Sequence, residues 1–314
     1  MLGLFLGFLF SILMLPRLIP YLNSIFLDFP NNRSSHVLPV PRAGGIAFVF
    51  APLIASFLSI FLLDISSPAS IWIPIISTPL AIVGLIDDRY SLPVRIRLIF
   101  QLLISFGLVS ISPLFPSFLI YPVLIFISSS VINFTNFMDG LDGLVAGCMS
   151  VALAAVSFSL SLPLPYWVLV GSLLGFVYFN WSPAKVFMGD VGSTFLGAVY
   201  FGLILQSSSW LQTLSFLLIL TPLLGDSLFC LLRRLFSGQR VFQAHCLHLF
   251  QRLQQAGWPH ARVSSFYIAG TVLLSIAMLL GGLFWVLMLA LVELLVGVWL
   301  DQRFAVPFKL ASLS

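Results

Sequence analysis

The chain has 314 residues, of which 60% are hydrophobic and only 8% are charged, and its mean hydropathy is +1.12. Soluble globular domains carry about 25% charged residues, so this composition excludes a domain with an ordinary water-facing surface. The formal net charge of +4 suits anionic lipid head groups and anionic substrates, and nothing in the sequence indicates binding to nucleic acid.

Long apolar stretches recur from one end of the chain to the other. A helix that crosses a bilayer needs about 20 mostly apolar residues, whereas strands of a membrane barrel would show alternating segments of about ten residues. The stretches are continuously apolar, so we expect an all-α, polytopic membrane protein that forms a single transmembrane domain over residues 1–314. The first stretch lacks a basic n-region and an A-x-A cleavage site and is interpreted as a span. About eleven spans are predicted, near residues 1–20, 43–63, 69–86, 98–112, 116–132, 143–160, 164–180, 192–207, 210–230, 264–281 and 283–301.

The basic residues fall in alternate loops. The loops after the second, fourth, sixth, eighth and tenth predicted spans contain no Lys or Arg. By the positive-inside rule the basic loops are cytoplasmic, which places the N-terminus outside and the C-terminus in the cytoplasm. The loops expected to carry the site on that face are about 21–42, 87–97, 133–142, 181–191 and 233–262.

The acidic residues are few and concentrated. Of the ten Asp and Glu, six lie at the predicted cytoplasmic ends of spans: Asp87, Asp88, Asp139, Asp142, Asp190 and Asp226. A carboxylate near hydrocarbon is costly and is normally paired or functional. Because simple surface acids would be spread over all loops, this distribution predicts a functional site on one membrane face.

The pair Asp87-Asp88 ends the third span and is followed by Arg95 and Arg97. Adjacent carboxylates repel each other unless a proton or a cation lies between them. A divalent metal such as Mg²⁺, which takes oxygen ligands, would relieve this repulsion. The alternative is a solvated helix end with interfacial arginines.

Polar residues recur at every third position in the next motif, at Asn133, Asn136, Asp139 and Asp142. This spacing places them on one face of a helix or helical turn. The alternative is an ordinary hairpin between two spans, with Asn and Asp as turn formers.

Phe187 precedes Gly189-Asp190, which leads directly into the eighth span. A helix N-terminus offers free N–H groups and the positive end of a dipole, so it can bind an anion. Asp190 beside it could hold the metal that such an anion needs. Alternatively, Ser193 or Thr194 is simply an N-cap.

His245 and His248 follow Asp226 in the largest basic loop. Two histidines at i and i+3 share a helix face and could bind metal or donate to phosphate; the alternative is an interfacial pair. The three cysteines have neither metal-type spacing nor a disulfide pattern, so packing is their expected role.

In this order, the motifs resemble those of the polyprenyl-phosphate N-acetylhexosamine-1-phosphate transferase family, whose members initiate peptidoglycan carriers, enterobacterial common antigen, teichoic acid and O-antigen. The resemblance runs from residues 41–45 to Gln251. The stretch 244–251, with 231–234 before it, is similar to the branch that starts O-antigen and other surface polysaccharides. The resemblance implies transfer of a sugar 1-phosphate from a UDP-N-acetylhexosamine to polyprenyl (undecaprenyl) phosphate, with release of UMP, at the cytoplasmic face of a bacterial inner membrane. It also allows a homodimer.

Carried over by position, the resemblance implies that Asp190 is the chief ligand of Mg²⁺, which Mn²⁺ could replace. Asp87 and Asp88 would act near the acceptor phosphate. His245 and His248 would contact phosphate or sugar.

The same carry-over implies that Asn133, Asn136 and Asp139 line the diphosphate and metal region, with Asp139 among the catalytic residues. Asp142 and Phe187 would hold the uracil.

Two departures concern the sugar rather than the reaction. The chain has Arg95 and Arg97, which we expect among the substrate-binding residues, where many relatives carry Lys. It has His-x-x-His where they carry a nearly continuous histidine cluster. For the reaction itself, we expect direct attack of the lipid phosphate on the sugar-bearing phosphorus, with a two-step route through an aspartyl-phosphate left open.

Three other functions fit the sequence less well. A transporter or flippase would carry charges near mid-span in repeated halves, and only Glu293 lies there. An intramembrane aspartyl protease needs a Tyr-Asp pair, which the sequence lacks. The CDP-alcohol phosphotransferases need a longer acidic run than 139–142 provides.

Overall fold

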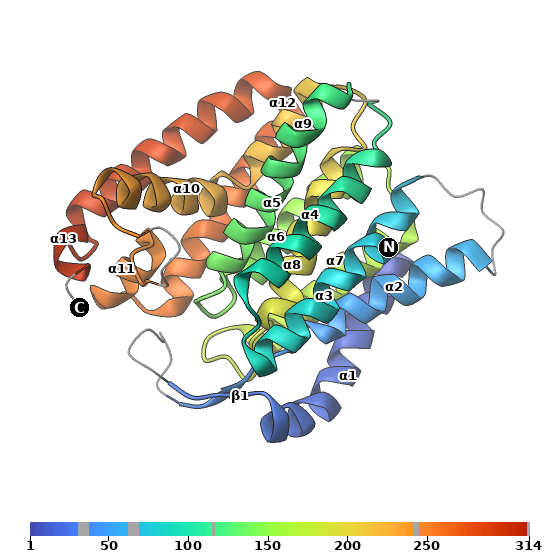
Figure 1. The fold of residues 1–314 in the computed structure, drawn as a ribbon, viewed down its shortest axis with the longest axis horizontal. Helices are drawn as coiled ribbons and strands as arrows, with labels where there is room; N and C mark the ends of the chain where they lie inside the picture. The colour runs from blue at the N-terminus through green and yellow to red at the C-terminus, as the bar shows by residue number, and fades with distance from the viewer. Residues whose placement is uncertain (31–37, 62–68, 115–116, 241–244, 313–314) are drawn as a thin grey trace.

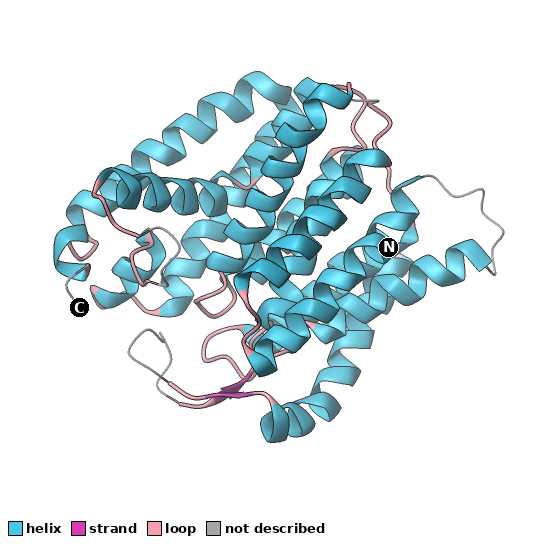
Figure 2. Cartoon of the chain, in the orientation of Figure 1, coloured by secondary structure: helices cyan, strands magenta, loops and turns pink. Residues whose placement is uncertain are grey.

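The computed structural model describes residues 1–30, 38–61, 69–114, 117–240 and 245–312, and most of them are helical (Figure 1, Figure 2). The elements in chain order are α1 (Leu2–Ile25), β1 (Leu27–Asp28), β2 (Val40–Pro41), α2 (Ile46–Phe61), η1 (Ala69–Trp72), α3 (Ile73–Tyr90), α4 (Val94–Ser110), η2 (Phe118–Ile120), α5 (Tyr121–Phe137), α6 (Leu144–Ser159), α7 (Leu164–Asn180), α8 (Gly189–Ile204), α9 (Trp210–Ile219), α10 (Thr221–Phe236), α11 (Leu249–Gln255), α12 (His260–Arg303) and α13 (Phe308–Ala311). The expected helical architecture is confirmed. Among the described residues, one short pair of strands, β1 and β2, departs from this helical architecture.

Several helices are apolar enough to cross a membrane. Four segments meet this condition by length and composition: Leu2–Ile25, Ala69–Tyr90, Phe118–Phe137 and His260–Arg303. A fifth is added if the bent pair α9 and α10 forms one span, and α2, α6, α7 and α8 are shorter apolar helices. The described part of the chain therefore has the helices of a membrane-embedded protein, while the count of eleven spans and their orientation stay predictions.

The predicted span 210–230 is wrong as a single straight helix. The chain bends by 81° between α9 and α10, and Figure 1 shows α10 lying across its neighbours. Pro222 in the first turn of α10 has no backbone N–H to continue the hydrogen-bond ladder of α9. Beyond it, α10 carries Asp226, Arg233 and Arg234, which are costly to bury in hydrocarbon.

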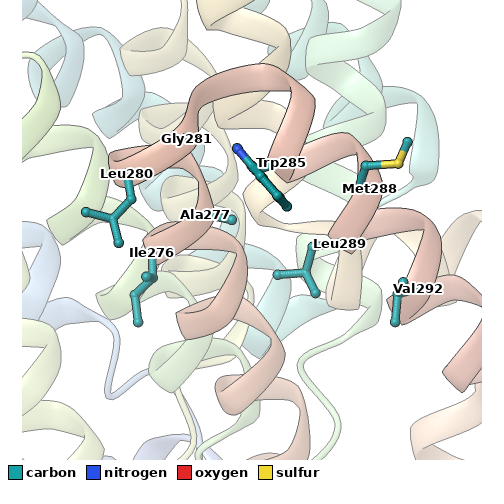
Figure 3. Close-up of a pocket in the computed structure, with 8 residues that line it drawn as sticks. All are labelled: Ile276, Ala277, Leu280, Gly281, Trp285, Met288, Leu289 and Val292. Atoms are coloured by element: carbon teal, nitrogen blue, oxygen red, sulfur yellow. The ribbon is translucent and has the colours of Figure 1, made fainter.

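The last two predicted spans join in α12, which is 44 residues long. Its helical geometry breaks at Gly282, with φ of 67° and ψ of −159°, between the predicted ranges 264–281 and 283–301. Glycine adopts such a positive φ without the steric penalty of a Cβ. Both sides of the break line an apolar pocket of about 400 Å³. Figure 3 shows Leu280 on one side of this pocket and Trp285 on the other.

Helix α8 lies in the interior of the bundle. It packs against α2, α3, α4, α5, α6 and α9, and every residue of α8 is buried except Asp190. Small residues such as Gly197, whose Cβ would lie 2.7 Å from the Cα of Ile132, let the neighbouring helices approach closely. The N-terminus of α8 therefore brings Asp190 to the middle of one end of the bundle.

The strands β1 and β2 support this end. They pair antiparallel, with Leu27 opposite Pro41 and Asp28 opposite Val40, and Arg42 forms a 2.7 Å ion pair with Asp28. The segment that follows then pairs with the chain before α8, because the N–H groups of Gly44 and Gly45 donate to the carbonyls of residues 187 and 188 at 2.9 and 3.0 Å.

At the C-terminal side, Asp301 joins three elements. It pairs with Arg233 of α10 at 2.8 Å and with Arg252 of α11. Arg252 is buried and also donates to the carbonyls of Leu247 and Val306 at 3.1 and 2.9 Å. This ion-pair network fastens α10 and α11 to the end of α12.

We expect Asp301→Asn to destabilise the fold by about 3–5 kcal/mol, because it leaves the buried Arg252 guanidinium without its counter-ion. The loss should appear as a lower melting temperature of the detergent-solubilised protein. Arg233→Gln is the matched control: Arg233 is partly exposed, so its loss should cost much less. Equal losses for the two variants would contradict a buried role for the Arg252–Asp301 pair.

Candidate active site

Four carboxylates, Asp87, Asp88, Asp139 and Asp190, form an acidic cluster. Asp87 and Asp88 lie in the last turn of α3, Asp139 in the loop after α5, and Asp190 in the first turn of α8. The positions of these residues in the sequence predict that they lie on one face of the membrane. The structure brings them together although more than 100 residues separate the first from the last.

Asp88 caps the N-terminus of α8. Its carboxylate accepts hydrogen bonds from the backbone N–H groups of Asp190 and Val191 at 3.1 and 3.3 Å. These N–H groups have no partner inside their own helix, and the positive end of the helix dipole favours the carboxylate. The N-terminus of α8, which was predicted to bind an anion, thus binds the carboxylate of Asp88 from the same chain.

Ser193 and Thr194 do not cap α8, which corrects the alternative interpretation of this motif. The hydroxyl of Ser193 donates to the carbonyl of Gly189 at 3.2 Å, and that of Thr194 donates to the carbonyl of Asp190 at 2.7 Å. Both hydroxyls therefore bond back along the helix.

Two glycines permit this close contact between α3 and α8. A Cβ on Gly84 would lie 2.5 Å from the backbone carbonyl of Asp190, and a Cβ on Gly189 would lie 2.4 Å from Oδ2 of Asp88. Gly189 also has a φ of 70°, a conformation that other residues adopt only with strain. Any larger residue at either position would push the paired aspartates away from Asp190.

Asp87 points to a different partner from Asp88. Its carboxylate accepts from Nη1 of Arg97 at 2.8 Å and from the N–H of Leu92. The same Nη1 lies 3.7 Å from Oδ2 of Asp190. Arg97 thus links Asp87 to Asp190, whereas Arg95 is exposed and forms no ion pair with any described residue. The adjacent aspartates therefore face different partners: Asp88 faces the backbone N–H groups of α8, and Asp87 faces the Arg97 guanidinium.

The two asparagines of α5 have different contacts. Nδ2 of Asn136 donates to Oδ1 of Asp190 at 2.8 Å and to Oγ of Ser193 at 2.9 Å. Asn133 instead exchanges two hydrogen bonds with Gln101 of α4, at 3.0 and 3.1 Å. Asn136 therefore belongs to the acidic cluster, and Asn133 fastens α4 to α5.

Asp139 lies in a buried and negatively charged environment. Burial first, and then the carboxylates of Asp190 and Asp88, raise the pKa of Asp139 well above its ordinary value, although Arg42 opposes the shift. Burial disfavours the charged form of a carboxyl group, and the two neighbouring carboxylates add to that effect. The potential metal ligands in the cluster are carboxylate and amide oxygens, which are the ligands that Mg²⁺ and other hard cations take.

Asp142 lies in a neighbouring group of contacts. It is buried; its Oδ2 accepts from the N–H of Ala184 at 3.2 Å and lies 3.2 Å from Nδ1 of His260. It thereby ties the loop after α5 to the segment before α8, which carries the half-buried Phe187. Neither His260, a lone histidine in the sequence, nor Gln101 was predicted as part of the site. An isolated Gln within an apolar span is a sequence signal that could have identified Gln101.

Asp226 organises the segment with the two histidines. Its carboxylate accepts from the N–H groups of Leu249 and Phe250 at 2.8 and 3.1 Å, and from the hydroxyl of Tyr267 at 2.8 Å. It therefore fastens the start of α11 to α10 and α12. This anchoring role was not among the predicted site functions.

His245 and His248 do not share a helix face, so this prediction was wrong. His248 is the N-cap of α11 and His245 lies in the loop before it. Their rings nevertheless lie side by side, with centroids 5.0 Å apart. The ring of Phe137, at the end of α5, lies 6.4 Å from that of His248, so the histidines approach the site from the side of the Asp139 loop. Burial, the His248 imidazole and the Arg234 cation lower the pKa of His245 to about 3, which keeps it neutral at physiological pH.

The sequence matches known proteins over the same region. The model of a family described as "Glycosyl transferase family 4" matches residues 70–208, which run from α3 through α8. The "Probable undecaprenyl-phosphate N-acetylglucosaminyl 1-phosphate transferase" of Bacillus subtilis is 29% identical over 275 residues, 78% of this chain and 75% of the relative.

Two other relatives cover similar shares. The "Decaprenyl-phosphate N-acetylglucosaminephosphotransferase" of Mycobacterium tuberculosis H37Rv is 32% identical over 289 residues, 75% of this chain and 70% of the relative. The "Phospho-N-acetylmuramoyl-pentapeptide-transferase" of Staphylococcus saprophyticus is 27% identical over 309 residues, 84% of this chain and 94% of the relative. The chain therefore belongs to glycosyl transferase family 4, among the membrane-embedded polyprenyl-phosphate N-acetylhexosamine-1-phosphate transferases.

Proposed function

We propose that the protein transfers N-acetylhexosamine 1-phosphate from a UDP-sugar to undecaprenyl phosphate or a similar polyprenyl phosphate, giving the lipid-linked sugar and UMP. The observation that carries this proposal is the acidic cluster with Arg97 between Asp87 and Asp190, at one end of a bundle of apolar helices. The names of the relatives from B. subtilis and M. tuberculosis support the same reaction.

The main obstacle to this reaction is charge. The acceptor phosphate has a second pKa near 6, so it is largely a dianion at neutral pH and already nucleophilic. Phosphoryl transfer is then mostly a matter of positioning and charge neutralisation. Arg97 is partly exposed and can contact a phosphate while it keeps Asp87 and Asp190 in place.

A divalent cation fits the donor set of the acidic cluster. Mg²⁺, or Mn²⁺ in its place, would neutralise the diphosphate of the donor sugar there. Asp190 would hold it as the chief ligand, since its carboxylate is partly exposed and Asn136 fixes one of its oxygens. Asp139 lies in the same electrostatic field and would complete the oxygen-rich side of the site.

Direct attack by the lipid phosphate remains our preferred route. A covalent route would need a carboxylate that is free to attack phosphorus. In the structure both oxygens of Asp87 accept hydrogen bonds, and both oxygens of Asp88 accept from α8. These contacts favour positioning roles for Asp87 and Asp88.

The histidines and the uridine site complete the proposal. His245 and His248 would contact phosphate or sugar from the side of α11, and Asp142 and Phe187 would hold the uracil. We assign the protein to the initiation of surface polysaccharide such as O-antigen, because residues 244–251 are similar to that branch. A homodimer is compatible with this assignment.

Orientation in the bacterial inner membrane gives the first test. In a variant whose three cysteines are replaced, a cysteine introduced at Ser161 should react with an impermeant maleimide in intact cells. A cysteine at Gln239 should react only after permeabilisation, because its loop carries basic residues and is cytoplasmic. Labelling at Gln239 in intact cells would overturn the orientation and the cytoplasmic site.

The second test concerns the nucleotide. Phe187→Ala should weaken binding of the UDP-sugar and inhibition by UMP by about 1–3 kcal/mol, roughly 5- to 150-fold, through loss of base stacking. The apparent affinity for the lipid acceptor should stay unchanged, and Phe187→Tyr, which keeps an aromatic ring, should behave almost like the wild type. An equal loss for both substrates would argue for a packing role instead.

The third test concerns Asp190. Membranes are incubated with radiolabelled UDP-sugars and polyprenyl phosphate, and the lipid-linked product is measured. Asp190→Asn keeps an oxygen acceptor for Asn136 but loses the negative charge, so the variant should insert normally and lose about 10²–10³-fold in transfer rate, typical of one preorganised electrostatic element.

EDTA should silence the wild-type protein, and Mg²⁺ or Mn²⁺ should restore it. Arg95→Gln is a control at an exposed charge on the same face and should cost far less than Asp190→Asn. Turnover of Asp190→Asn that persists in EDTA would remove the metal role and leave Asp190 as a structural residue.

A further inference from the structure

Three potential soft-metal ligands meet beside α11. Cys230 of α10, His245 and His248 each offer one ligand atom, and these three atoms lie within 4.8 Å of one another. Cys230 and His248 are buried, whereas His245 is partly exposed and gives access from outside. We refer to Cys230, His245 and His248 as the thiol–imidazole cluster.

The distances are close to those of a metal site. Bond lengths of about 2.3 Å for Zn–S and 2.0–2.1 Å for Zn–N in a tetrahedron place neighbouring ligand atoms roughly 3.3–3.6 Å apart. The cluster can reach this spacing by side-chain rotation, since His245 lies in a loop and its ring already faces that of His248.

Asp226 stands where a supporting carboxylate is found in metal sites. Its Oδ1 lies 3.8 Å from Nδ1 of His248, and its position is fixed by two backbone N–H groups and the hydroxyl of Tyr267. Nδ1 of His248 is buried and makes no hydrogen bond within the described part of the chain. In metal sites a hydrogen bond from one ring nitrogen to a carboxylate orients the other nitrogen toward the metal. At 3.8 Å this bond is not formed in the structure, and Asp226 is placed to accept it when the His248 ring turns toward a bound metal.

The charges around the cluster act in both directions. Neutral imidazole and thiolate are the forms that bind a metal, and burial together with Asp226 raises the pKa of the Cys230 thiol to about 12, so the metal itself must displace the thiol proton. Arg234 opposes a cation here, but the Cys230 thiolate formed on binding and the Asp226 carboxylate supply two negative charges. The thiol proton of Cys230 is released to solvent when the metal binds.

We propose that Cys230, His245 and His248 form a second metal site, separate from the acidic cluster, that takes a borderline or soft divalent cation of the zinc class. Thiolate and imidazole ligands select such cations, whereas Mg²⁺ takes oxygen. Three protein ligands leave the fourth tetrahedral position to water, as in open zinc sites. This assigns Cys230 a role beyond the packing expected for it.

Occupancy of this site should inhibit the transfer reaction. This consequence rests on the proposed function, in which His245 and His248 contact phosphate or sugar. A bound zinc ion takes the imidazole lone pairs and holds both rings beside Cys230, so the histidines no longer serve the substrate.

Direct binding tests the site without any use of activity. The purified full-length protein is titrated with Co²⁺, whose bond to a thiolate gives a charge-transfer band in the near ultraviolet. The wild type should show this band at one Co²⁺ per chain, Zn²⁺ should abolish it, and excess Mg²⁺ should not. Cys230→Ser and His245→Gln should lose or weaken the band, whereas Cys148→Ser and Cys246→Ser should keep it. A wild type without the band, or an unchanged band in Cys230→Ser, would overturn the site.

Activity then tests the consequence. With Mg²⁺ saturating, Zn²⁺ should inhibit the wild type, and Cys230→Ser should keep its basal rate while requiring at least about tenfold more Zn²⁺ for inhibition, in line with the loss of a ligand. Zinc binding without inhibition would overturn the regulatory role alone. A protein that binds Co²⁺ through Cys230 but makes no lipid-linked sugar would refute the proposed function and leave the metal site standing.

Discussion

The contact between the end of α3 and the start of α8 is the constraint on which the site depends. Asp88 accepts hydrogen bonds from two free N–H groups of α8, and Gly84 and Gly189 remove the side chains that would keep the helices apart. Because every other residue of α8 is buried, the packing of this helix fixes the position of its first turn. This contact leaves Asp190 as the residue of α8 that reaches the surface of the site.

The aspartates of the acidic cluster differ in the groups that they contact. Each aspartate near α8 has a different partner: Asp88 has the helix terminus, Asp87 has Arg97, and Asp190 has Asn136 and the far side of Arg97. Burial and the carboxylates of Asp190 and Asp88 together raise the pKa of Asp139. Phosphoryl transfer depends on charge neutralisation, so a cation at this cluster would suit the proposed reaction.

A carboxylate also caps the start of a second helix, α11. Asp226 accepts from two N–H groups at the start of that helix, as Asp88 does at α8. The bend between α9 and α10 carries Asp226 and Cys230 to this position, and Asp301 fastens the outer ends of α10 and α11 to α12. The histidine segment is therefore held by buried charges rather than by a long helix of its own.

The sequence by itself determined the helical class, the apolar segments, the boundary between two of them at residue 282 and the set of aspartates that the structure brings together, because hydropathy and the cost of charge near hydrocarbon are properties of short segments. Only the tertiary structure decided what each polar group contacts. Asn133 and Asn136 have the same spacing signal, yet one binds Gln101 and the other Asp190, since the neighbouring helix differs at each position. The bend at residue 220, the partnership of His260 with Asp142 and the meeting of Cys230 with two histidines likewise join segments that are distant along the chain. Their contacts depend on how whole helices pack, which no local pattern encodes.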